Sequence, residues 1–202
     1  MKTTLEKIFL SLLIAPLAPL AGGMGAWVLA YLALPEAWFP YTVLAGLLLG
    51  MIADIFILKK LLTRYHQLSL VFWLSVLLFY AVGLFGLFMG VPIFHVLLAI
   101  PAGFVMGGRL AAEKSDSPRL RKTTNKTCLV TTGLLALTCM SSAFFALASP
   151  STPADLQGML GLDFSVTPVM LWGLILAGGS LLLVVNWALT ALSTHLAYRF
   201  LR

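Results

Sequence analysis

Four polar side chains stand alone within long apolar stretches of this 202-residue chain. Asp54 carries a carboxylate that suits a cation or a proton, and His95 carries an imidazole ring, a group that proteins use to bind or transfer protons. Tyr80 adds a phenolic hydroxyl, and Asn186 adds an amide that donates and accepts hydrogen bonds. Such groups are costly in hydrocarbon and therefore indicate function by default. The sequence predicts a ligand-binding set of Asp54, Tyr80, His95 and Asn186.

A structural use is open for Asp54 and Asn186. Asp54 lies five residues before Lys59, about 7.5 Å along a helix, so it would pair with that cation or reach interfacial water. Asn186 would make a hydrogen bond between two helices, typically worth ~0.6 kcal/mol. Because the two residues lie at similar depths, they could also face each other across a helix bundle. Both interpretations stay open at this stage.

His95 and the hydroxyl side chains have structural alternatives as well. Pro101 leaves the carbonyl of Leu97 without its usual helical donor, so a neutral His95 would hydrogen-bond there. Tyr80 lies near the middle of its segment, where its hydroxyl needs a partner. We expect five further hydroxyls to bond to their own helix backbone: those of Thr131, Thr132, Thr138, Ser141 and Ser142.

The sequence contains no motif for hydrolysis, nucleotide binding or metal binding. No two carboxylates fall within apolar segments, and no Cys/His spacing indicates zinc or haem. Cys128 and Cys139 are about 16 Å apart along a helix, too far for a disulfide. No cofactor, metal or nucleic-acid partner is predicted, and a role other than enzyme is favoured.

Composition places these residues in a membrane. The chain is 60% hydrophobic and 10% charged, whereas soluble domains carry roughly 25% charged residues. Six crossings of about 20 residues each would fill most of the chain. We therefore predict an all-α fold, a single domain of six transmembrane helices.

The six segments follow from apolar length and from breaks. As one helix, the stretch 68–112 would be about twice as long as the bilayer core is thick. Gly90 and Pro92 mark the turn that divides it. A retained first helix is favoured over a cleaved signal peptide, because the N-terminal apolar stretch is longer than the apolar region of a signal peptide. Pro16 and Pro19 should kink that helix. The predicted helices cover about 8–34, 41–58, 68–89, 92–112, 127–148 and 168–192, with a cytoplasmic loop at 113–126 and an outer loop at 149–167.

Charge sets the predicted orientation. With six crossings, all 13 Lys and Arg residues fall on one side, and the opposite loops carry only Glu36, Asp155 and Asp163. Positive loops stay inside, so both termini should be cytoplasmic and the protein should lie in the cell (plasma or inner) membrane. The net charge of +6 is then a topological signal.

The outer loop at 149–167 should contain a short interfacial helix. Thr152 is expected as its N-cap, with Pro153 at the first helical position. Gly161 is a plausible stop.

Small residues predict close helix packing. Gly103 and Gly107 have the small-xxx-small spacing that lets helix backbones approach, within one chain or between chains. Residues 19–26 and 101–108 also resemble each other weakly, which is compatible with an inverted repeat.

Three functions remain open. The first is a small-solute carrier or substrate-binding membrane subunit, which requires the polar candidates to share a cavity. The second is a non-catalytic assembly subunit with a membrane-protein partner or a second copy, supported by the glycines and by the basic segment Arg119–Lys122. The third is a lipid enzyme using Asp54, Lys59, Lys60 and His66.

Overall fold

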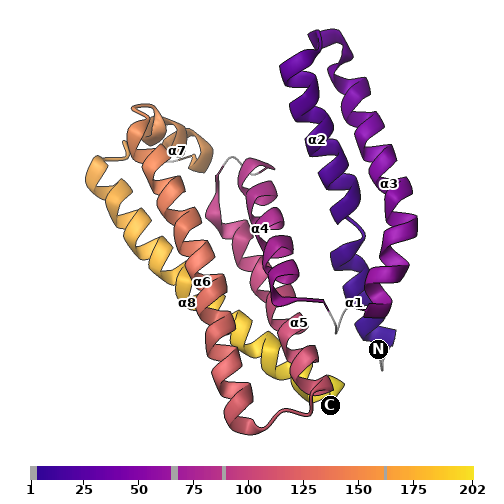
Figure 1. Ribbon diagram of the computed structural model, residues 1–202. Coiled ribbons are helices and arrows are strands. Elements are labelled where there is room, and N and C mark those ends of the chain that lie inside the picture. Colours follow the sequence, from indigo (N-terminus) through magenta and orange to yellow (C-terminus); the bar gives the residue numbers. More distant parts are fainter. Residues whose placement is uncertain (1–3, 65–67, 88–89, 162) are drawn as a thin grey trace. The chain divides into compact units, whose positions relative to one another are not determined.

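The computed structural model describes residues 4–64, 68–87, 90–161 and 163–202, and these are helical with short connections and no strand (Figure 1). The chain divides into two compact units, Met1–Leu70 and Val71–Arg202, and each is considered by itself. His66 lies outside the described residues.

The first unit is a helical hairpin with a broken first arm. Pro16 cannot donate a backbone hydrogen bond, and the first arm is interrupted at Ala15–Pro16 as predicted. Pro19 lies in the first turn of the next helix, where an N–H has no helical acceptor, so it does not break the helix. The elements are α1 (Thr4–Ile14), α2 (Leu17–Ala33), the 3₁₀ helix η1 (Glu36–Trp38) and α3 (Phe39–Arg64).

Glycine brings α2 and α3 into backbone contact. A Cβ atom added to Gly22 would lie 2.3 Å from the carbonyl oxygen of Gly46, and one added to Gly50 would lie 2.3 Å from that of Ala18. No larger residue fits at these positions without moving a backbone. Gly46 and Gly50 have the same spacing as Gly103 and Gly107, and sequence analysis missed this pair.

The second unit contains four further membrane-length segments. Gly90 has a φ of 79°, a conformation that favours glycine, and it marks the predicted break before Pro92. Along the chain the elements are α4 (Leu70–Leu87), the 3₁₀ helix η3 (Pro92–Leu98), α5 (Ala99–Ala112), α6 (Ser117–Ala148), α7 (Thr152–Leu160) and α8 (Pro168–Leu201).

The predicted small-residue spacing is used inside this unit, between α5 and α8. A Cβ atom on Gly103 would lie 2.6 Å from the carbonyl oxygen of Thr190, and one on Gly107 would lie 2.3 Å from that of Thr194. Ser193 on α8 also donates a hydrogen bond to the carbonyl of Ile100, at 2.7 Å. The spacing therefore serves packing within the chain.

Within the described residues, six stretches are long and apolar enough to cross a membrane, which agrees with the predicted number. They are Glu6–Ala33, Glu36–Thr63, Leu70–Leu87, Pro92–Ala112, Ser117–Ala148 and Pro168–Leu201.

Several predicted boundaries differ from the structure. The helix predicted at 41–58 is α3 and continues to Arg64, and the helix predicted at 168–192 is α8 and continues to Leu201. The hydrophilic segment 113–126 is not all loop, because α6 begins at Ser117, just after Asp116, with Pro118 in its first turn. Charged residues are good helix formers, so the helix continues beyond the apolar segment. The start of the fourth segment, Pro92–Leu98, is a 3₁₀ helix. The N-cap of α7 is Ser151 and not the predicted Thr152, and Gly161 ends this helix in a left-handed conformation.

Candidate functional site

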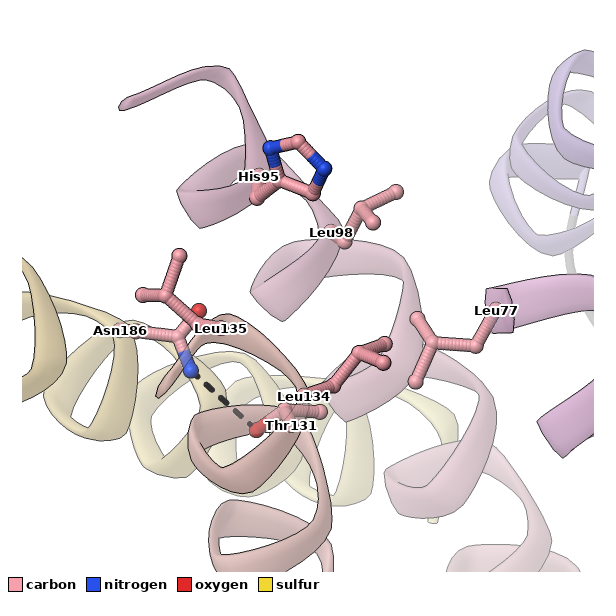
Figure 2. A pocket seen from close by; sticks show the side chains of 7 residues that line it. All are labelled: Leu77, His95, Leu98, Thr131, Leu134, Leu135 and Asn186. Atoms are coloured by element: carbon pink, nitrogen blue, oxygen red, sulfur yellow. Dashed lines mark hydrogen bonds between the residues drawn. The ribbon is translucent and has the colours of Figure 1, made fainter. Parts of the chain in front are cut away.

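The centre of the second unit is a polar contact between α6 and α8. Asn186 on α8 is 1% exposed, and its side-chain nitrogen donates to the hydroxyls of Thr132 at 3.1 Å and Thr131 at 3.4 Å. An amide nitrogen has two hydrogens, so both donors of Asn186 have partners on the neighbouring helix. Figure 2 shows this nitrogen directed toward Thr131, with the His95 ring apart from both.

A second buried threonine closes this network. The hydroxyl of Thr190, which is fully buried, donates to the backbone carbonyl of Asn186 at 2.9 Å. Because that bond uses its single hydrogen, Thr190 accepts from the hydroxyl of Thr131, 3.0 Å away. Asn186, Thr131 and Thr190 are therefore linked by hydrogen bonds that join two helices.

The network borders a small internal cavity, shown in Figure 2. Its volume is about 10 Å³, close to the minimum that accommodates one water molecule. The lining combines two polar side chains of the network, one histidine and four leucines. It is formed by Leu77, His95, Leu98, Thr131, Leu134, Leu135 and Asn186.

His95 joins η3 to α4. Its ring is 3% exposed, and Nε2 lies 2.8 Å from the backbone carbonyl oxygen of Ala81. A carbonyl oxygen can only accept, so Nε2 is the donor in this bond. The partner is Ala81 and not the predicted Leu97. The other ring nitrogen, Nδ1, is buried without a hydrogen-bond partner in the described structure.

Of the four predicted site residues, the structure brings two to one cavity. His95 and Asn186 both line it, whereas Tyr80 on α4 is not among the lining residues and packs beside the Phe79 ring. Asp54 lies on α3 in the first unit, half-buried, and it forms no hydrogen bond or ion pair with another described residue. A shared site for all four remains a prediction.

Sequence analysis missed Thr190 and the role of Thr131 toward α8. The signal was available, because Asn186, Thr190 and Thr194 recur at every fourth residue and so occupy one face of α8. The expected bonds of hydroxyls to their own helix are present for Thr138, Ser141 and Ser142. The Thr131 hydroxyl also lies 3.1 Å from the carbonyl oxygen of Thr127, but the network described above uses its single hydrogen for the bond to Thr190. The Thr132 hydroxyl instead accepts from Asn186.

The polar groups considered for a lipid enzyme do not form a described cluster. Lys59 and Lys60 are exposed on α3, and His66 is outside the described residues.

Among the described residues, six apolar segments of membrane-spanning length are compatible with a multi-pass membrane protein. No protein-family model, curated protein or solved structure matches the chain.

Proposed function

We propose that this multi-pass membrane protein is a non-catalytic assembly subunit, one that acts by packing against another membrane protein. The observation that carries the proposal is the hydrogen bonding of the Asn186 side-chain nitrogen to α6. Both of its amide hydrogens donate to α6, so the best polar candidate for holding a solute is engaged in holding two helices together.

The size of the neighbouring cavity supports the same conclusion. Ligand pockets usually enclose roughly 300–1,000 Å³. The cavity beside Asn186 encloses about 10 Å³, so it has room for one water and for no organic solute. Opening it would break hydrogen bonds that join α6 to α8.

Helical glycines that contact no other described helix are a second argument for an assembly subunit. Gly133 on α6 and Gly173 on α8 have nothing within 4 Å of an added Cβ atom, unlike Gly103 and Gly107. Glycine costs a helix about 1 kcal/mol relative to alanine. A transmembrane helix of a partner protein, approaching closely at these positions, would offset that cost.

The test measures the mass of the assembly. The tagged chain, extracted from its own membranes in mild detergent, should elute at a defined protein mass well above the 21.8 kDa of one protomer. Gly173→Leu should reduce that mass, and Leu192→Phe, an enlargement at an exposed α8 position far along the helix from Gly173, should leave it unchanged. Recovery of a folded protomer alone from wild type would contradict the proposal.

A small-solute carrier is the second candidate, favoured by one observation. His95 and Asn186 line the same cavity, and Nδ1 of His95 has no described partner there or elsewhere. A carrier predicts that some solute raises the melting temperature of the purified protein, and that Asn186→Ala abolishes the rise while Asp54→Asn reports whether the first unit contributes. A broad solute screen without any shift would favour the assembly subunit.

We also propose that the protein lies in the cell membrane with both termini in the cytoplasm. The support is the one-sided distribution of its 13 Lys and Arg residues. A cysteine introduced at Lys122 should react with a membrane-impermeant maleimide only after cells are permeabilised. Labelling of intact cells would overturn this orientation.

A further inference from the structure

The first turns of α6 extend out of the hydrocarbon as a rigid basic helix. From Thr127 to Ala148 the helix has no charged residue and spans about 33 Å, the thickness of a bilayer core. Residues 117–126 continue the same helix without a break. Lys126 therefore lies at the edge of the hydrocarbon, and Lys122 lies about 6 Å further out, within the headgroup layer.

One side of this extension is fixed against the rest of the second unit. Leu120, Thr124 and Cys128 are buried at successive helical turns. Leu120 belongs to an apolar cluster with residues of α5 and α8, and Tyr198 on α8 donates its hydroxyl hydrogen to the carbonyl of Ser115, at 2.7 Å. The helix consequently cannot rotate freely about its axis.

The opposite side presents the cations. Arg119, Lys122 and Lys126 are exposed and spaced three and four residues apart, which places them on one face. Arg121 is also exposed, but it lies about 100° around the helix from Lys122. Glu113 forms an ion pair with Arg119 at 2.7 Å. No described acidic side chain forms an ion pair with Arg121, Lys122 or Lys126.

We propose that the face of α6 formed by Lys122 and Lys126, flanked by Arg121, binds the phosphate-bearing headgroups of anionic phospholipids in the adjacent leaflet. Three unpaired cations at headgroup depth attract negative lipid by screened electrostatics. Burial of the other face keeps Lys122 and Lys126 directed away from the helix bundle, and Arg121 is exposed at the margin of the buried face. The inference does not depend on the proposed assembly function.

The test titrates lipid onto the purified full-length protein in neutral detergent, with bound lipid counted by native mass spectrometry. Wild type should prefer phosphatidylglycerol to phosphatidylcholine, and raising the salt concentration should weaken the preference. In the triple variant R121Q/K122Q/K126Q, the affinity ratio of phosphatidylglycerol to phosphatidylcholine should fall about fivefold for each cation removed. Unchanged helix content and melting temperature would show that the variant is folded, as its exposed positions predict.

Two controls separate this surface from charge in general. The variant R121K/K122R/K126R keeps the charge and should keep the preference. The variant K7Q/K59Q/K60Q removes the same charge from exposed positions of the first unit and should also keep it. The proposal is overturned if wild type retains both lipids equally, if the two neutralised variants lose the preference alike, or if a poly-glutamate peptide binds this face in preference to phosphatidylglycerol.

Discussion

Both units of this protein pack helices closely at glycine residues, and the second unit also joins helices through polar side chains. In the first unit, glycines bring α2 and α3 into backbone contact. In the second unit, Gly103 and Gly107 do the same for α5 and α8, and α6 joins α8 through Asn186 and two threonine hydroxyls.

The difference shows which interactions specify a membrane bundle. Lipid is as apolar as a leucine side chain, so burial of apolar surface gives helices little reason to associate. Close van der Waals contact at small residues is enough for a hairpin, whose helices are already joined by a short turn. A bundle of four segments has more possible arrangements, and polar side chains with fixed partners select one of them.

The strongest way to break this comparison is to fill the α5–α8 contact. Gly107→Ala should destabilise the second unit by about 3 kcal/mol, because the new Cβ atom would lie 2.3 Å from a backbone oxygen of α8. Thermal unfolding in detergent, with hydrogen exchange to localise the loss, measures the effect. Gly133→Ala is the matched control, since its Cβ atom meets nothing within 4 Å, and an equal loss there would contradict the packing argument.

The same substitution in the hairpin should cost less. Gly50→Ala would place a Cβ atom 2.3 Å from the carbonyl oxygen of Ala18, yet the two arms can separate into lipid, so about 2 kcal/mol is expected. Faster hydrogen exchange should be confined to α2 and α3. Gly25→Ala, where nothing lies within 4 Å, should cause no loss and should stabilise the helix by up to about 1 kcal/mol, and a loss spread over both units would argue against independent packing.

Removing the polar contact between α6 and α8 should destabilise the second unit less than filling the glycine contact does. Asn186→Leu should reduce the free energy of unfolding by about 1 kcal/mol, because two interhelical hydrogen bonds disappear. Thr132→Val, which removes one acceptor, should cost about half as much. A loss above about 2 kcal/mol, or no loss at all, would show that these hydrogen bonds do not contribute the stability typical of interhelical hydrogen bonds in membrane bundles.

Asp54 should give the smallest effect. It is half-buried and has no hydrogen-bonded or ion-paired partner among the described residues, so Asp54→Asn should change the unfolding free energy by less than about 0.5 kcal/mol. Equilibrium unfolding compared with Asn186→Leu provides the measurement. A larger destabilisation would indicate a partner for the carboxylate and would bring the first unit into the candidate site.

The suspected internal repeat finds no support in the packing. In an inverted repeat, residues 19–26 and 101–108 would contact equivalent neighbours. Instead α2 packs mainly on α3, the next helix in the chain, whereas α5 packs mainly on α8, the last one. The shared glycine pattern reflects the same packing chemistry at two unrelated contacts.

Sequence alone determined the class of this protein, the six crossings, and the breaks at Pro16 and at Gly90–Pro92. These follow from local physics, namely apolar length against bilayer thickness and the backbone limits of proline and glycine. Only the tertiary structure decided that Asn186 bonds to Thr131 and Thr132, that His95 bonds to Ala81, and which helix each glycine face meets. Those pairings join residues distant along the chain, and apolar periodicity carries no information about which helix lies beside another.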